Sequence, residues 1–443
     1  MRWEYFGPLG ETDGLISNYD FTSGKLVQGR SYDRTLTNFS PRLGFAYNVG
    51  KQLVMRGGYG LYYDYIPQNL LIANYTNAAG ITTNPIGSKP VVPLGFDSTA
   101  WATGSGAAYI PYDGSYSIFG TNSNFRVPYT QSWNLNLQHE LGRAASFEVG
   151  YVGSKGSHLT RLYDANQTDA DGNYPNSDYA QIAILTTEAA SKYNALQTTL
   201  RIRNLHGLTG FSTYNWSHSI DDASDGIDFT AGAAMPQDSF NLAAERGNST
   251  FDTRQRFTVA LNYRAPRLTL GPEWLSKGWQ LNTITTVQSG RPIPIVTSND
   301  TSGRYNYRQR PNLVAGKNPI LAHWSPATGY LNPEAFTQPE QGTFGNLGRN
   351  QIYSAGFWNT DFSLEKSTTL RGDLELQLRA EVFNLFNHPN FALPNGSLSF
   401  GQDSSGQALP MGAISQTPDV AQGNPGLGGG GPRVLQLGAR LQF

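Results

Sequence analysis

The chain contains 443 residues, of which 38% are hydrophobic, 15% charged and 12% aromatic, and its formal net charge is -1. Soluble domains usually carry about 25% charged and nearly half apolar residues, so this composition argues against an ordinary soluble enzyme. The balanced charge excludes the basic footprint of a nucleic-acid-binding protein. The absence of cysteine excludes disulfides, zinc ribbons and thiol nucleophiles. The aromatic content is too high for a disordered chain.

Alternation of apolar and polar side chains predicts about a dozen β-strands of about 7–12 residues. In chain order they cover 2–6, 42–49, 53–64, 132–140, 146–152, 194–203, 208–217, 256–263, 279–288, 358–366, 374–382 and 434–443. The last strand is the clearest, because Leu437, Ala439 and Leu441 fall on one face while Gln436 and Arg440 fall on the other. No apolar run approaches the ~20 residues that a membrane helix needs.

The connections between these strands alternate between long and short along the whole chain. Tight connections at 49–52, 141–145 and 204–207 contain glycine, whereas connections such as 66–130 and 289–357 are long. Outer-membrane barrels have short periplasmic turns and long extracellular loops. Only a helix or a closed, fully paired sheet can cross hydrocarbon. We therefore expect an all-β protein, an antiparallel transmembrane barrel in the outer membrane of a Gram-negative-type bacterium, in contact with its lipid.

Several segments resemble the barrel of TonB-dependent receptors of the Oar-like group, whose complete members carry a carboxypeptidase-regulatory-like domain. They are SPRLGFAYNV, VMRGGYGLYYD, VPYTQSWNLNLQHEL, EVGYVGSKGSHL, YNALQTTLRIR, AERGNSTFDTRQRF, SGRPIPI, FGNLGRN, WNTDFSLEKS and EVFNLFNHPNF. The resemblance implies a 22-strand barrel, of which this chain supplies about 11–12 strands. Residues 1–443 would then be the C-terminal part of such a barrel, without the plug, TonB box, signal peptide or regulatory-like domain.

The resemblance also implies a function and partners. We expect a fragment of a receptor for energised uptake of an unidentified extracellular ligand, with the TonB complex contacted only through the missing N-terminal part. The terminal residues Leu437, Ala439, Leu441 and Phe443 are similar to the signal that the barrel-assembly machinery recognises. An alternative is a passive outer-membrane or surface-adhesion barrel whose long loops bind polysaccharide or a partner protein. A soluble β-rich carbohydrate-binding protein is a third possibility.

A cluster of charged residues lies where a long loop meets a strand. Glu245, Arg246, Asp252, Arg254 and Arg256 occur within AERGNSTFDTRQRF. We expect these residues to form a structural charge network at the extracellular rim, with ligand contact as a lesser role.

A second cluster is acidic. Asp221, Asp222, Asp225 and Asp228 offer the oxygen ligands that Ca²⁺ prefers, but the sequence lacks the bidentate glutamate of a calcium loop. These residues are a weak metal candidate, and the simpler interpretation is a polar extracellular loop. The six histidines include no HExxH motif, and no GxSxG or phosphate-binding loop is present. We therefore expect no enzyme activity and no cofactor.

Overall fold

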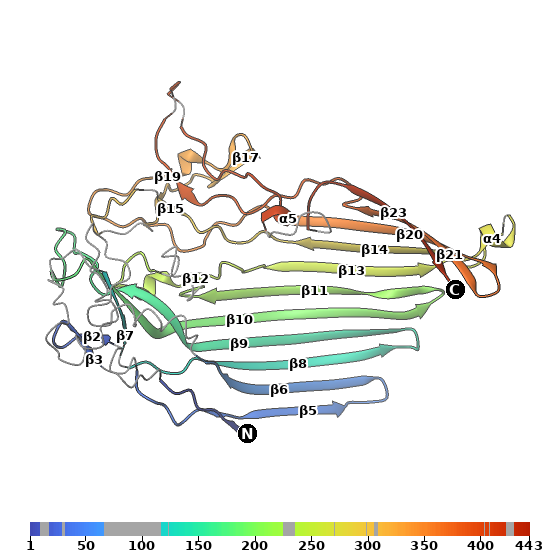
Figure 1. Ribbon diagram of the computed structural model, residues 1–443, viewed down its shortest axis with the longest axis horizontal. Coiled ribbons are helices and arrows are strands. Elements are labelled where there is room, and N and C mark those ends of the chain that lie inside the picture. The colour runs from blue at the N-terminus through green and yellow to red at the C-terminus, as the bar shows by residue number, and fades with distance from the viewer. Residues whose placement is uncertain are drawn as a thin grey trace, which may run out of the picture.

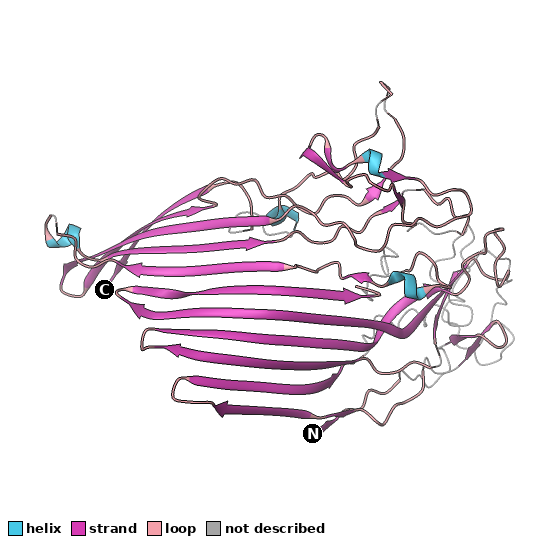
Figure 2. Ribbon diagram, turned by 180° about the vertical axis from the view of Figure 1, so that it is seen from behind, coloured by secondary structure: helices cyan, strands magenta, loops and turns pink. Residues whose placement is uncertain are grey.

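The computed structural model describes residues 1–8, 17–28, 32–65, 117–122, 124–224, 235–269, 271–297, 299–304, 309–402, 404–406, 408–421 and 429–443. Its dominant element is one broad antiparallel sheet that runs across the length of the molecule (Figure 1, Figure 2). The strands in this sheet follow one another in chain order, as expected for an up-and-down barrel wall. The all-β prediction is confirmed.

Eleven strands form the main path of the sheet. They are β5 (Arg42–Asn48), β6 (Leu53–Tyr63), β8 (Tyr129–Leu141), β9 (Ala145–Asp164), β10 (Gln181–Leu205), β11 (Leu208–Asp221), β13 (Gln255–Arg264), β14 (Trp279–Gln288), β20 (Phe357–Arg371), β21 (Leu374–Phe383) and β23 (Val434–Gln442). Strands β5 and β23 lie at the two ends of the order, so the sheet is an open wall.

Short strands decorate the ends of this wall. The predicted strand at 2–6 is reduced to β1 (Arg2–Trp3), which pairs with β4 (Phe39–Ser40) just before β5. Strand β7 (Ser117–Thr121) pairs with β10, and β12 (Gly247–Asn248) pairs with β11. Four more pairs lie in the connections: β2 (Ser17–Asp20) with β3 (Lys25–Gln28), β15 (Val296–Thr297) with β22 (Ser397–Leu398), β16 (Asn312–Leu313) with β19 (Phe336–Thr337), and β17 (Ile320–Ser325) with β18 (Gly329–Leu331).

The short and long connections lie at opposite ends of the wall, which we call the turn end and the loop end (Figure 1). At the turn end, β10 and β11 are joined by His206 and Gly207, whose φ angles are 53° and 88°. Two successive residues with positive φ are the signature of a type I′ hairpin, and glycine adopts that conformation without steric cost. The longest turn carries helix α4 (Glu273–Ser276).

The two faces of the wall differ in polarity. On the outward face, Leu43, Leu135, Leu196 and Leu437 are exposed. On the inward face polar side chains bond across strands, as in Arg56 to Gln138, Arg203 to Glu140, Asn282 to Glu365 and Gln377 to Glu365. Alternation along a strand places every second residue on the same face. The wall therefore presents an apolar surface on one side and a bonded polar surface on the other.

Strand β9 is nearly three times, and β10 two and a half times, as long as the sequence predicts. Both continue past the wall into the loop end, where β7 pairs with β10. In this extension Ile182, Ile184 and Leu185 are almost fully buried. Both faces are covered there, so the apolar–polar alternation that marks the rest of each strand is lost. The connection between the strands predicted at 146–152 and 194–203 is therefore shorter than the sequence implies, since only 165–180 joins β9 to β10.

The hydrophobic core of the described residues lies at the loop end, in the long connections and in the extensions of β9 and β10. The largest cluster includes Ile293, Tyr330, Phe336, Leu398 and Met411, which come from the connections 289–356 and 384–433. Short helices in the same connections are η1 (Leu242–Glu245), η2 (Pro333–Ala335) and α5 (Pro418–Ala421). We call this packed assembly at the loop end the loop cap.

The outward and inward faces respond differently to added charge. Val259 lies on the outward face in the middle of β13, opposite Ser212 and Thr285, and Thr258 is its inward neighbour. We expect Val259→Arg to lower the free energy of unfolding by ~2–4 kcal/mol, because lipid cannot solvate the guanidinium. Thr258→Arg is the matched control and has little effect. The measurement is urea unfolding of the full-length protein in phospholipid vesicles, and equal losses for both variants would show that the outward face does not contact lipid.

A second prediction concerns Asp164, the last residue of β9, at the loop end. Burial raises the pKa of the Asp164 carboxyl, although its Oδ1 accepts bonds from the amides of Asn166 and Ile182. The folded state therefore holds the proton more tightly than the unfolded state, and the cost of burial grows as the pH rises above the unfolded value of ~3.9. We expect Asp164→Asn to slow hydrogen exchange at 164–185 at pH 7, with the gain vanishing near pH 4.

Asp169 supplies the control of opposite sign. It is exposed, and hydrogen bonds from Asn173 lower the pKa of its carboxyl. Its stabilising contribution is therefore present at pH 7 and is lost on acidification. Asp169→Asn should speed exchange slightly at pH 7. A faster exchange in Asp164→Asn at pH 7 would contradict the assignment of desolvation as the main cause.

Candidate functional site

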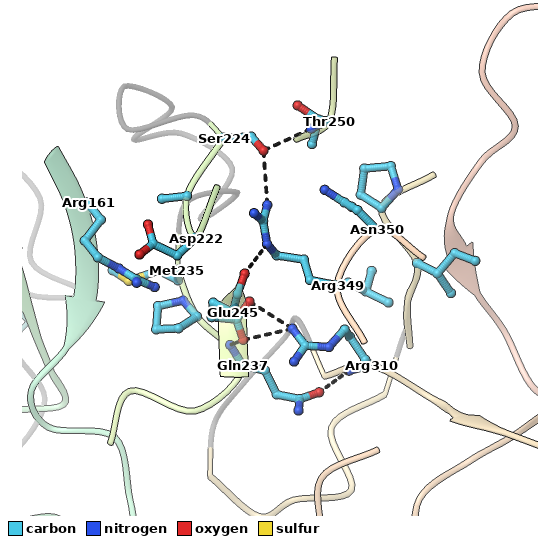
Figure 3. Close-up of a pocket in the computed structure, with 15 residues that line it drawn as sticks. Arg161, Asp222, Ser224, Met235, Gln237, Glu245, Thr250, Arg310, Arg349 and Asn350 are labelled. Carbon is cyan, nitrogen blue, oxygen red and sulfur yellow. Dashed lines mark hydrogen bonds and ion pairs between the residues drawn. The ribbon is translucent and has the colours of Figure 1, made fainter. Parts of the chain in front are cut away.

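A cavity of about 250 Å³ lies inside the loop cap, where two long connections meet the end of β9 (Figure 3). Its lining comes from the end of β9, from 222–224 and 235–250 in the β11–β13 connection, and from 294–296, 310 and 349–350 in the β14–β20 connection. The lining includes five charged side chains, namely Arg161, Asp222, Glu245, Arg310 and Arg349. This cavity is the candidate functional site.

The first ion pair of the cavity is buried, and one guanidinium nitrogen bridges both carboxylate oxygens. The Nη1 atom of Arg310 donates to Oε1 and Oε2 of Glu245, at 2.8 and 2.9 Å, and both side chains are less than a tenth exposed. The amide of Gln237 donates to the same Oε1 at 3.0 Å. The side-chain oxygen of Gln237 in turn accepts from the amide of Arg310 at 2.7 Å. These bonds satisfy the buried carboxylate and join the two connections.

The second ion pair is centred on Arg349. Its guanidinium contacts Asp221 Oδ1, donates from Nη2 to the Asp221 carbonyl at 2.6 Å, and donates from Nη1 to Ser224 Oγ at 3.1 Å. Its Nε donates to the carbonyl of Glu245 at 2.5 Å. Arginine presents five donors in a rigid fork, so one side chain can tie several backbone groups together. Arg349 therefore clamps the end of β11 to helix η1.

A third arginine lies in the same cavity without such a set of bonds. Arg161 is 1% exposed, and its Nε has no hydrogen-bond partner within the described parts of the chain. Burial lowers the pKa of its guanidinium, and the charge of Asp222 partly offsets this effect. Burial also raises the pKa of the Asp222 carboxyl, whose Oδ1 accepts from the amide of Ala190. Arg161 and Asp222 line one wall of the cavity beside Met235 (Figure 3).

The acidic cluster is only partly visible. Asp221 faces Arg349 and accepts two bonds from Ser224 Oγ, while Asp222 lies toward Arg161. Asp225 and Asp228 lie outside the described residues. The two described carboxylates have different arginine neighbours, so a metal ion would have to compete with Arg349 for Asp221 and with Arg161 for Asp222. Metal binding by this cluster stays a prediction.

The residues predicted to form the rim network are divided among several environments. Glu245 and Asp252 are buried, and Asp252 accepts from the amide of Ser219 at 2.7 Å and from the Tyr353 hydroxyl at 2.8 Å. Arg246 is exposed at the end of η1. The Arg254 carbonyl accepts from the Ser217 amide, and Arg256 lines the inner wall on β13. The two carboxylates therefore bond to groups outside the predicted set.

Local sequence patterns do not reveal the three arginines that line the cavity. Arg161 belongs to an extended strand, and Arg310 and Arg349 lie 65 and 128 positions from the carboxylates they bind. Arg349 lies within FGNLGRN, one of the segments that carry the family resemblance. The resemblance of that segment to the receptor family could have pointed to Arg349, whereas no sequence feature pointed to Arg310.

The terminal strand is placed where an assembly factor could reach it. Leu437 and Leu441 project from the outward face of β23 and are 74% and 57% exposed, and Phe443 is 97% exposed. Ala439 lies between them, opposite Leu378 on β21. One edge of β23 pairs with β21, and the strand ends the order of the sheet. Recognition by the assembly machinery stays a prediction.

The buried ion pair can be tested by removing one or both partners. We expect Arg310→Ala to cost ~3–5 kcal/mol, because it leaves the Glu245 carboxylate buried and unpaired. The double variant Arg310→Met with Glu245→Leu should cost far less, since no charge remains buried. Hydrogen exchange of 237–250 in the full-length protein measures the loss. Lys317→Ala, which breaks an exposed pair with Glu334, is the control and should leave exchange unchanged. Equal losses in the single and double variants would rule out the charge as the cause.

Helices give no membrane span, since none in the described ranges is both long and apolar enough to cross a bilayer. A search of curated proteins finds no match to the sequence. Among solved structures, the outer membrane transporter YddB from Escherichia coli is similar with a TM-score of 0.44 and 10% identity, covering 92% of this chain and 40% of YddB.

Two further structures are similar at the same level. The siderophore receptor PiuA from Acinetobacter baumannii has a TM-score of 0.42 and 8% identity over 90% of this chain and 35% of PiuA. FpvA of P. aeruginosa, bound to heterologous pyoverdines, has a TM-score of 0.43 and 10% identity over 94% and 34%. The chain thus spans about two fifths or less of the length of these proteins.

Residues 1–436 match the family model described as the outer membrane beta barrel domain. The match covers nearly the whole chain, and it agrees with the antiparallel wall, the alternating faces and the segregation of short turns from long loops. In such barrels the short turns face the periplasm and the long loops face the exterior. The chain therefore belongs to the outer membrane β-barrel domain family and is a protein of the bacterial outer membrane.

Proposed function

We propose that this chain is the C-terminal part of the barrel of a TonB-dependent receptor of the Oar-like group, which takes up an extracellular ligand with energy supplied through TonB. The proposal rests on the resemblance of its segments to that group and on the way the fold brings those segments together. Family membership places the wall in the outer membrane.

One observation carries the proposal furthest. Three of the segments that resemble Oar-like receptors meet at the cavity of the loop cap, although they are far apart in the sequence. AERGNSTFDTRQRF contributes Glu245 and Thr250, SGRPIPI contributes Pro294 and Ile295, and FGNLGRN contributes Arg349. Segments that pack against one another must fit one another, so their joint presence indicates a shared structural unit. That unit is a cap that holds the loops over the inner wall.

The arrangement suits capture and passage of a ligand. The loop cap is rigid, because its charged groups are bonded to backbone groups of two connections, and binding groups held on a rigid support lose little entropy on binding. The inner wall below it is polar and bonded, which gives a hydrated path. Contact with the TonB complex belongs to a plug and TonB box in the N-terminal part of the receptor. We also propose that the barrel-assembly machinery recognises the outward row that ends at Phe443.

The test begins with the product of the complete reading frame that contains this chain. The protein is extracted in detergent and mixed with the purified periplasmic domain of TonB from the same bacterium. We expect the two to bind, and we expect substitution of the TonB box by proline to abolish binding while the heat-modifiable mobility of the folded barrel is kept. A folded barrel that never binds TonB, or a reading frame that encodes no plug, would overturn the proposal in favour of a passive barrel or adhesin.

A further inference from the structure

A lysine lies on the outward face of the wall among apolar side chains. Lys366 of β20 is opposite Trp279 of β14 and Leu378 of β21, and Leu378 is opposite Ala439 of β23. The neighbouring outward row toward the loop end is Leu281, Leu364, Ala380 and Leu437, and that toward the turn end includes Thr368, Leu376 and Leu441. Lys366 is thus the one charge in these three rows. An ionisable residue on a lipid-facing surface is a functional candidate with a partner to be named.

Neighbouring side chains largely cover the residue Lys366, and no anion lies beside its ammonium group in the described parts of the chain. The residue is 8% exposed, and its Nζ donates to the Ser367 carbonyl at 2.7 Å and to Thr368 Oγ1 at 2.5 Å. The Trp279 ring centre lies 5.8 Å from Nζ. An ammonium has three donors, so one remains for another acceptor. No ion pair of Lys366 occurs within the described ranges. A buried cation without an anion is costly, which favours an anionic partner from outside the chain.

An apolar groove of about 810 Å³ leads away from this ammonium group. Trp274 and Leu275 of α4 form one wall, and Leu364, Leu378 and Leu437 form its floor. Helix α4 is fixed over the sheet, because Trp279 Nε1 donates to the Leu275 carbonyl at 2.7 Å and Thr368 Oγ1 donates to the Trp274 carbonyl at 3.2 Å. Trp274 itself is 62% exposed. The lining also includes Arg379, which is paired with Glu365 on the inward face. The site thus combines one outward-facing cation without an ion-pair partner in the described ranges, an exposed tryptophan and an apolar floor.

We propose that this groove holds one glycerophospholipid of net negative charge, with its phosphate on Nζ of Lys366 and an acyl chain along Leu364, Leu378 and Leu437. The groove lies toward the turn end, which faces the periplasm in outer-membrane barrels, so lipid of the periplasmic leaflet has direct access. A free phosphate ion would leave the apolar floor unused, and a hydrocarbon chain alone would leave the ammonium unpaired. The inference goes beyond the proposed receptor function and depends only on the outer-membrane location.

The competing explanation is a lysine that extends its ammonium to the headgroup region without selecting a lipid. That explanation predicts equal occupancy by charged and zwitterionic lipids. A specific site predicts that occupancy depends both on the charge of Lys366 and on the space above Ala380, which lies opposite Leu364 and Leu437 on the groove floor.

The experiment is native mass spectrometry of the full-length protein released from nanodiscs that contain equal amounts of phosphatidylglycerol and phosphatidylcholine. We expect one retained phosphatidylglycerol per wild-type barrel, and about tenfold lower retention in Lys366→Gln, because a charge-assisted hydrogen bond is lost. Lys277→Gln is the matched control, since Lys277 directly follows α4 at the same end of the wall, is exposed and pairs with Glu273. Retention should be unchanged in that variant.

A second variant separates the groove from the charge. Ala380→Phe fills the floor with an apolar group and leaves Lys366 in place, so it should also reduce retention, while heat-modifiable mobility reports that the barrel is folded. Equal retention of the two lipids by wild type, equal loss in Lys366→Gln and Lys277→Gln, or full retention by Ala380→Phe would each overturn the proposal. None of these results bears on TonB binding, so the two proposals fail independently.

Discussion

The need to pair every backbone amide away from water governs this structure. In hydrocarbon an unpaired amide or carbonyl has no solvent to bond with, so the part of the chain that crosses the membrane must be a sheet with each strand hydrogen-bonded to its neighbours. The nine strands between β5 and β23 meet this condition by following one another in chain order, whereas β5 and β23 are each paired along one edge of the described wall. Because successive side chains point to opposite sides, one face meets lipid and the other meets water. A single sheet of this kind has no interior, and apolar burial must occur elsewhere.

The loop cap is where that burial occurs, and it is held by charge as well as by packing. Arg310 and Arg349 each join groups from two connections, and their partners are buried. A buried pair gains little net stability over an apolar pair of the same shape, because both charges lose their hydration. Such a pair adds geometric specificity, since the rigid guanidinium fork donates hydrogen bonds only to partners in a matching arrangement. The paired arginines therefore select one packing of long loops that contain many glycines and prolines.

The sequence predicts the wall well and the cap poorly, for a physical reason. Each wall strand has one apolar and one polar face, so β13 and β23 are visible as alternation in a single segment. The extensions of β9 and β10 are buried on both sides, and their pattern no longer distinguishes strand from loop. The cavity is harder still to predict, because Arg161, Arg310 and Arg349 acquire their surroundings from segments that only the folded chain brings together. Local patterns report solvent exposure, and they do not report partners at long sequence separation.

The position of the core in the loop cap means that two solvents stabilise this protein. The outward face of the wall is matched to lipid, whereas Ile293, Leu331 and Leu398 are buried away from water outside the bilayer. Burial from water weakens on cooling and has a large heat-capacity signature, whereas contact with lipid tails carries no such signature. The stability of the loop cap and the stability of the wall therefore depend differently on temperature. Cooling therefore lowers the stability of the loop cap more than that of the wall.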